Sequence, residues 1–203
     1  MFFIKFFLLF IMFSFTGWLI EILFVYIDQK VLVNRGFLFG PYLPIYGFGS
    51  LLYILVLKKY YSEPYVIFFG SLIISFILEY LTSYILELIF HEKWWDYSEK
   101  KYNINGRVCL ETLIPFGLFS LICIYIIYPF YLYIISKINI NILIPLTILI
   151  FVLYVIDSIC SIFITLRIKN INYEYKNNKN LKRITKKINN KEKREYERNN
   201  NIE

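Results

Sequence analysis

Long hydrophobic runs alternate with short polar segments along most of the chain. Five such runs lie at about residues 2–27, 42–57, 65–90, 108–134 and 142–166. An α-helix rises 1.5 Å per residue, so about 20 apolar residues cross the roughly 30 Å hydrocarbon core of a bilayer. The second run, of about 16 residues, is barely long enough. The pattern predicts an all-α integral membrane protein, a bundle of about five transmembrane helices.

Composition agrees with this prediction. The 203 residues are 58% hydrophobic, 21% aromatic and 18% charged, which argues against a soluble domain. Lys5 before an apolar run is reminiscent of a signal peptide. The run continues to about Tyr26 without a small-residue cleavage site, so it predicts a first span instead. Abundant Ile, Asn, Lys and Tyr indicate an AT-rich, bacterial genome.

The net charge of +7 belongs to the C-terminal segment. Residues 167–203 hold 12 Lys and Arg against 5 Asp and Glu, whereas ten of each sign cancel in residues 1–166. We predict a transmembrane helical domain over 1–166 and a basic, largely disordered tail over 167–203. The tail either enforces membrane orientation or is attracted to anionic lipid headgroups. No nucleic-acid partner is expected.

The orientation follows from the bias of Lys and Arg toward cytoplasmic segments. An odd number of spans places the termini on opposite sides of the membrane. A cytoplasmic tail then puts 18 Lys and Arg inside and four outside. We therefore predict a multi-pass protein of the bacterial cytoplasmic membrane, with the N-terminus outside and the C-terminus cytoplasmic.

Acidic side chains within the hydrophobic runs are the first candidates for function, because an ionised carboxylate at membrane depth costs several kcal/mol. These acids are Glu21, Glu79, Glu87, Glu111 and Asp157. The predicted topology brings Glu21, Glu87 and Glu111 to the cytoplasmic side, beside loops that contain Arg35 and Arg107. We predict a polar cluster at the inner leaflet with the two arginines as counter-ions. It is either a structural ion-pair network or a ligand site.

Helical spacing places further polar groups on common faces. Arg107 and Glu111, four residues apart, can be neighbours on one helical face. Two longer stripes follow the same spacing: Glu79, Thr82, Ser83 and Glu87, and then Asp157, Ser161 and Thr165. The stripes either form interhelical hydrogen bonds or line a polar pathway. Glu79 is the deepest acid and the best candidate for proton coupling.

Two connecting segments carry unusual residues. Glycine and proline prevent a regular helix through residues 36–44, which indicates either a re-entrant loop or a tight entry into the second span. In the segment 91–107, Trp94, Trp95 and Tyr97 form an interfacial aromatic belt or, together with Asp96, a more specific site. Asn105 and Gly106 are a turn signal.

Several kinds of chemistry have no motif in this sequence. Three cysteines without a C-x-x-C pair and a single histidine, His91, predict neither disulfides nor a metal site. Nucleotide-binding loops of the Walker A or Rossmann type and the G-x-S-x-G hydrolase motif are all missing. We expect a chain without cofactors that is not an enzyme.

A family resemblance rests on five blocks of residues. They are Gly17-Trp18-x-x-Glu21; Asn34-Arg-Gly-Phe-Leu-x-Gly-Pro41 with Pro44-Ile-Tyr-Gly47; Glu79-Tyr-x-Thr-Ser83; Trp94-Trp-Asp-Tyr-Ser98; and Asn105-Gly-Arg-x-Cys-Leu-Glu111. Over residues 14–120 they resemble the CmpB-like permease group of bacterial membrane proteins, the type IV ABC-transporter family. The resemblance implies a permease-like transporter subunit that uses ATP only through a separate ATPase chain. It also implies a homo-oligomer or larger complex, in which the 91–107 loop could contact the ATPase.

Two other functions remain open. An intramembrane enzyme acting on a lipid-linked substrate would use Glu87, Asp96 or Glu111 for acid–base chemistry, while Arg35 and Arg107 would hold phosphate. A non-catalytic membrane scaffold would need the acidic and basic residues only for structure.

Overall fold

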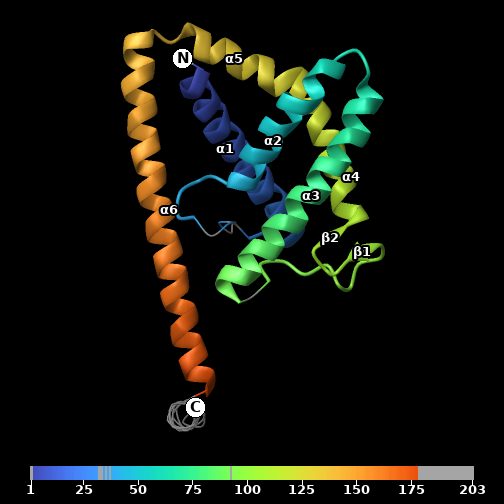
Figure 1. Cartoon of the computed structure of the whole chain (residues 1–203), viewed down its shortest axis with the longest axis vertical. Helices are drawn as coiled ribbons and strands as arrows, with labels where there is room; N and C mark the ends of the chain where they lie inside the picture. The colour runs from blue at the N-terminus through green and yellow to red at the C-terminus, as the bar shows by residue number, and fades with distance from the viewer. Residues whose placement is uncertain (1, 32–33, 35, 37, 92, 178–203) are drawn as a thin grey trace, which may run out of the picture. The chain divides into compact units, whose positions relative to one another are not determined.

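The computed structural model describes residues 2–31, 34, 36, 38–91 and 93–177 (Figure 1). The chain divides into two compact units, Met1–Ser161 and Ile162–Glu203. The helices are α1 (Phe2–Gln29), α2 (Pro44–Leu57), α3 (Pro64–Phe90), α4 (Leu110–Ile122), α5 (Tyr128–Lys137) and α6 (Ile140–Asn177). A 3₁₀ turn, Lys58–Tyr60, follows α2, and a π-helix, Cys123–Ile127, joins α4 to α5. Strands β1 (Asn103–Ile104) and β2 (Val108–Cys109) form an antiparallel pair.

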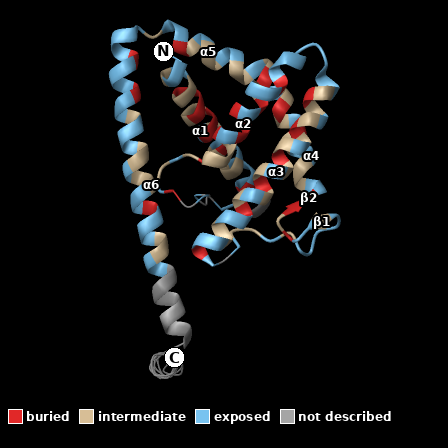
Figure 2. Cartoon of the chain, viewed as in Figure 1, coloured by how far each residue is buried: buried red, intermediate tan, exposed pale blue. Residues whose placement is uncertain are grey.

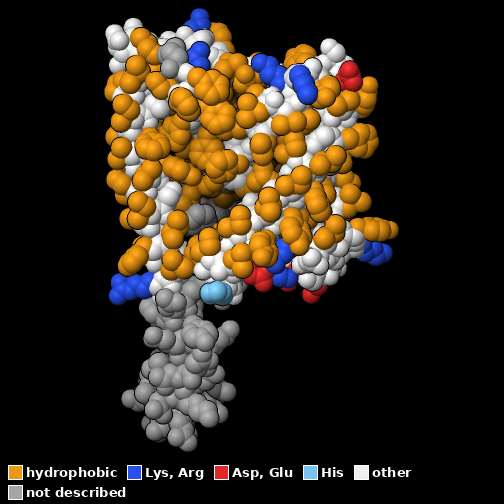
Figure 3. Space-filling view, in the orientation of Figure 1, with side chains coloured by type: hydrophobic (Ala, Val, Ile, Leu, Met, Phe, Trp, Pro, Cys, Tyr) orange, Lys and Arg blue, Asp and Glu red, His pale blue; other side chains and the backbone are white. Residues whose placement is uncertain are grey.

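Four helical segments of the described chain are long and apolar enough to cross a membrane: Phe2–Ile27, Pro64–Phe90, Leu110–Lys137 and Ile140–Ile168. Only 39% of the most apolar window is buried in the first segment and 28% in the second. The exposed remainder is hydrophobic, and Figure 3 shows such side chains covering one face of α2 and α3 between two charged ends. These features confirm an all-α membrane protein.

The second predicted span, 42–57, differs from the other four. It forms α2, whose 14 residues measure about 21 Å at 1.5 Å per residue. This is shorter than the hydrocarbon core of roughly 30 Å, so five full spans are not confirmed. The Leu43 N–H donates to the Ser14 carbonyl at 3.0 Å, near the middle of α1. The helix therefore begins half-way along α1.

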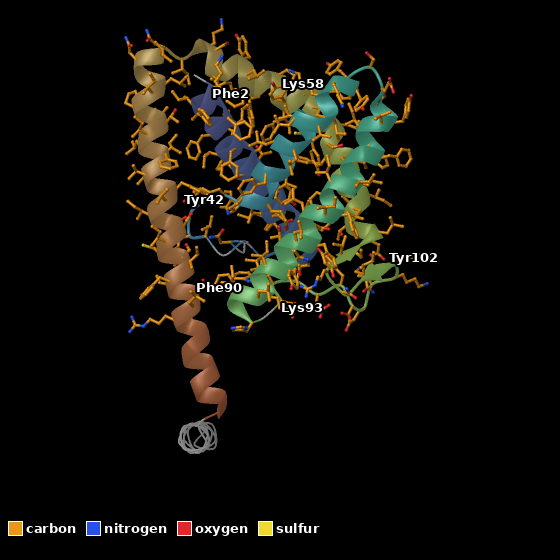
Figure 4. All side chains as sticks on the ribbon, in the orientation of Figure 1. Phe2, Tyr42, Lys58, Phe90, Lys93 and Tyr102 are labelled. Carbon is orange, nitrogen blue, oxygen red and sulfur yellow. The ribbon has the colours of Figure 1, made fainter. Side chains whose placement is uncertain are left out.

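The chain still returns to its starting end through α2. Figure 4 shows Phe2 and Lys58 at one end of the first unit and Lys93 at the other. Because α2 starts mid-way along α1, it covers only part of this passage. The loop 38–43, called the inner loop below, leads into α2 at that depth. Backbone of this kind is tolerated at membrane depth when it is buried in protein.

Small side chains let the helices pack closely. Gly47 of α2 is buried against Ser14 and Phe10 of α1. The Ser120 hydroxyl of α4 donates to the Ser71 hydroxyl of α3 at 2.8 Å. Interfaces between membrane helices favour such small residues. Figure 2 shows the buried positions on the sides of α1, α2 and α3 that meet.

The third long segment is bent where α4 meets α5. Pro129 has no N–H to bond the carbonyl four residues earlier, and the π-helix Cys123–Ile127 ends two residues before it. A π-turn is a recognised cause of a helix kink, and in Figure 1 α5 turns away from the direction of α4. The predicted span 108–134 thus corresponds to one continuous but bent helical segment, Leu110–Lys137, and its first two residues belong to β2 instead.

The predicted tail begins inside a helix. α6 continues past residue 166 to Asn177, so the first part of the segment 167–203 is helical. Residues 178–203 lie outside the part of the chain that the structure describes.

Candidate functional site

Two acids meet in the interior of the helical bundle. Glu79 of α3 is only 6% exposed, and the Thr112 hydroxyl lies 3.5 Å from its Oε2, at the outer limit of a hydrogen bond. Tyr46 of α2 donates its hydroxyl to Glu21 of α1 at 2.7 Å. The two carboxyl groups also interact electrostatically. We call Glu21, Tyr46, Glu79 and Thr112 the buried acid cluster.

A small cavity adjoins the buried acid cluster. It offers about 20 Å³ and is lined partly by Tyr46, Ser50, Tyr53, Ser75 and Glu79. A space of that size is about as large as one water molecule. The cavity therefore has no room for a larger solute.

Residues 93–109 form a folded hairpin segment after α3. Asn105 and Gly106 have positive φ of 54° and 68°, and the Arg107 N–H donates to the Ile104 carbonyl at 3.0 Å. The bond closes a β-turn over residues 104–107 whose two central residues both have positive φ, and it confirms the turn signal. The Trp95 indole donates to the Arg107 carbonyl at 2.8 Å.

The hairpin segment reaches the buried acid cluster through Tyr97. Burial raises the pKa of the Tyr97 phenol above its ordinary value, and the nearby carboxyl groups of Glu79 and Glu21 raise it further. The Tyr97 N–H donates to the Gly106 carbonyl at 2.7 Å. Tyr97 is therefore a neutral hydroxyl fixed between the hairpin and the bundle, while Tyr102 projects outward (Figure 4) and is 81% exposed.

Arg107 fastens the hairpin segment to α3. Its Nη2 lies 2.5 Å from Glu87 Oε2 and its Nη1 lies 3.2 Å from Ser83 Oγ. The guanidinium carbon is 5.7 and 5.4 Å from the ring centres of Tyr80 and Tyr84, within cation–π range. These four partners follow one face of α3, so a single arginine sets the position of the hairpin on the helix.

The inner loop is held by Asp157 of α6. Asp157 accepts hydrogen bonds from the N–H groups of Phe39 at 3.2 Å and Gly40 at 3.0 Å. It also accepts one from the Tyr42 hydroxyl at 2.5 Å. The glycine and proline keep this loop from forming a helix, so its backbone N–H groups have no helical acceptors. One carboxyl group accepts from two of them.

These features can be compared with known proteins. A family model described as "Putative ABC-transporter type IV" matches residues 8–162. The chain belongs to this family. The match confirms the resemblance found in the sequence, and it extends from α1 into α6. No curated protein matches the chain, and no solved structure does.

In this type IV family member, the predicted inner-leaflet cluster divides into separate groups. Glu87 and Arg107 are paired, whereas Glu21 joins Glu79 in the buried acid cluster. Glu111 lies 2.8 Å from Lys100 and is exposed. Arg35 lies outside the described residues.

The predicted helical pairing of Arg107 with Glu111 is wrong. α4 begins only at Leu110, and Arg107 precedes it in the hairpin turn, so the two residues do not share a helix. Residues four positions apart are neighbours only within a continuous helix, and no such helix joins Arg107 to Glu111.

The other predicted side chains serve the hairpin segment. Asp96 lies 3.5 Å from Lys93, and hydrogen bonds from Ser98 lower the pKa of its carboxyl. Trp94 is half-buried, with its ring 5.7 Å from that of Phe90. Neither Asp96 nor the two tryptophans belong to the buried acid cluster.

Asp157 is the residue whose role the sequence did not reveal. Helical spacing places this intramembrane acid on one face with Ser161, and the Ser161 hydroxyl does donate to it at 3.1 Å. Its partner loop lies more than 110 residues away in sequence. The only hint in the sequence is Gly40-Pro41, which prevents a helix and so leaves the Gly40 N–H in need of an acceptor from another segment. Among the described residues, no group of three or more His, Cys, Asp and Glu could hold a metal ion.

Proposed function

We propose that this chain is the membrane subunit of an ABC-type transporter. A separate ATPase chain supplies the nucleotide site, and this chain contributes no catalytic residue and holds no cofactor. Membership in the type IV family supports the proposal. So does the sequence, which has no Walker A loop.

In this proposal the protein lies in the cytoplasmic membrane of a bacterium with its N-terminus outside. That orientation leaves the hairpin segment and the basic C-terminal residues on the cytoplasmic side. It places 18 of the 22 Lys and Arg there, as the bias toward positive cytoplasmic segments favours. The short helix α2 is compatible with this orientation, because Lys58 at its end lies at the same end of the first unit as Phe2 (Figure 4).

The hairpin segment is the proposed contact for the ATPase, and its anchoring is the observation that carries the proposal. Arg107 ties it to Glu87 of α3 at 2.5 Å, and its strand β2 continues directly into α4 at Leu110. Tyr97 extends from it toward the buried acid cluster. A displacement of the hairpin by the ATPase would therefore act on two spans and on the polar interior together.

The test is purification of the tagged chain, with its native partners, in lipid nanodiscs. We expect a second chain with a nucleotide-binding motif and ATP hydrolysis that depends on both chains. Tyr102→Asp, at the exposed face of the hairpin, should release the second chain. Tyr61→Asp, a matched exposed tyrosine at the opposite end, should retain it. Recovery of the chain without any ATPase, even after chemical crosslinking, contradicts the proposal.

A further inference from the structure

A second cavity lies at the C-terminal end of α3, apart from the buried acid cluster. It is open, has a volume of about 370 Å³, and is lined by Tyr84, Glu87, Leu88, His91 and Arg107. We call it the Arg107 pocket. Figure 3 shows acidic and basic side chains together at this end of α3, directly below the hydrophobic face. The pocket therefore lies where the apolar span ends.

The guanidinium of Arg107 is fixed but not saturated. Among the described residues it donates to Glu87 and to Ser83. An arginine side chain has five N–H donors, so three of them are not used by these two bonds. Its side chain is 12% exposed and lines the opening. A phosphate oxygen is the acceptor that such a group binds best.

The charges of the pocket are balanced. Glu87 is 36% exposed at its side chain and lies beside the arginine, so the net charge is zero when His91 is neutral. A simple anion would meet both Arg107 and the carboxylate. A zwitterion with phosphate and a primary ammonium would satisfy both, because its ammonium would donate to the Glu87 carboxylate.

The apolar surface next to the pocket suits acyl chains. Leu88 is 56% exposed, Ile85 49% and Tyr84 46%, and all three belong to the span Pro64–Phe90. A headgroup in the pocket would have its acyl chains along this surface, whereas a soluble zwitterion would leave the surface unused.

We propose that the Arg107 pocket binds the headgroup of a phospholipid with a primary amine, such as phosphatidylethanolamine. Arg107 holds the phosphate and Glu87 holds the ammonium. This site is independent of an ATPase, so it can be correct even if the proposed transporter function is wrong. It assigns a lipid-binding role to a pair that otherwise only fastens the hairpin segment to α3.

The experiment is native mass spectrometry of the full chain with phosphatidylethanolamine, phosphatidylcholine or phosphatidylglycerol of identical acyl chains. We expect phosphatidylethanolamine to be retained about tenfold more strongly, the effect of one charge-assisted contact. Glu87→Gln keeps an acceptor for Arg107 but makes the pocket positive, so the preference should shift to phosphatidylglycerol. Glu111→Gln, the matched acid outside the pocket, should keep the wild-type preference.

Two results would overturn the proposal. One is equal retention of the three lipids, or a preference that Glu87→Gln leaves unchanged. The other is displacement of the lipid by soluble phosphoethanolamine at equal concentration, which would identify a soluble ligand. If Glu87→Gln does not fold, a photoreactive phosphatidylethanolamine on the wild-type chain decides. It should label peptides that contain residues 84–91, and labelling confined to other peptides would reject the site.

Discussion

Replacing Asp157 with alanine should detach the inner loop from α6. The carboxyl group accepts from two backbone N–H groups and from the Tyr42 hydroxyl, at 2.5 to 3.2 Å. Hydrogen bonds to charged groups contribute roughly 1.5–3 kcal/mol each, but side-chain bonds between membrane helices average about 0.6 kcal/mol. Phe39 is 60% exposed, so water can replace part of its bond.

The loss from Asp157→Ala is therefore about 2–4 kcal/mol for the loop, between these two limits. Asp157→Asn retains one acceptor oxygen and should lose about half as much. Since 1.4 kcal/mol is a factor of ten, the opening equilibrium of the loop should rise roughly 30- to 1,000-fold in the alanine variant. The N–H of Gly40 is the group to follow, because its only described partner is Asp157.

Hydrogen exchange of peptides covering residues 38–43, with the protein in nanodiscs, measures this opening directly. Ser158→Ala is the matched control, because the Ser158 hydroxyl donates within its own helix to the Tyr154 carbonyl at 2.7 Å. The reasoning is refuted if Asp157→Ala leaves the protection of these peptides at the wild-type level. It is also refuted if Ser158→Ala abolishes the protection equally.

Three further predictions concern the hairpin segment. Gly106→Ala should destabilise the hairpin by about 1–2 kcal/mol, because the φ of Gly106 is +68° and an added Cβ would meet the Asp96 side chain. The loss should appear as faster hydrogen exchange over residues 93–109. Unchanged hydrogen exchange there would contradict the prediction. Lys100→Gln should leave the melting temperature unchanged, because its ion pair with Glu111 is exposed; a clear drop contradicts this. The raised pKa of Tyr97 means that the folded state holds this proton more tightly, so stability should fall as pH rises above the phenol's ordinary value of about 10. Tyr97→Phe should weaken that fall in an alkaline melting series, whereas Tyr61→Phe, a change to an exposed phenol, should not.

Hydrophobic runs predicted the helices closely because each span is a local property of the chain. The runs 2–27 and 65–90 became Phe2–Gln29 and Pro64–Phe90, with Pro64 at the first helical position as its fixed φ allows. The depth at which α2 starts was not local. It depends on a hydrogen bond between Leu43 and Ser14, about 30 residues apart, and the run 42–57 contains no sign of it.

The candidate site was predictable in its parts but not in its pairing. The acids of α3 were placed on one face, and Glu79, Ser83 and Glu87 do follow one face of this helix. The partner of Arg107 was chosen by helical spacing from Glu111. In the structure Arg107 lies in the turn between β1 and β2, so the hairpin, and not a helix, determines which side chains it can contact. Contacts between segments depend on tertiary structure, and the spacing of residues within one segment does not predict them.

The contact of the hairpin segment with an ATPase is tested most directly by site-specific photocrosslinking in intact membranes. A photoreactive residue at Tyr102, which is 81% exposed, should crosslink to a chain that carries a nucleotide-binding motif. The same residue at Tyr61, which is 51% exposed at the opposite end, should not. Crosslinking from Tyr61 alone, or Tyr102 reacting only with reagents added outside the cell, would contradict both the orientation and the proposed function.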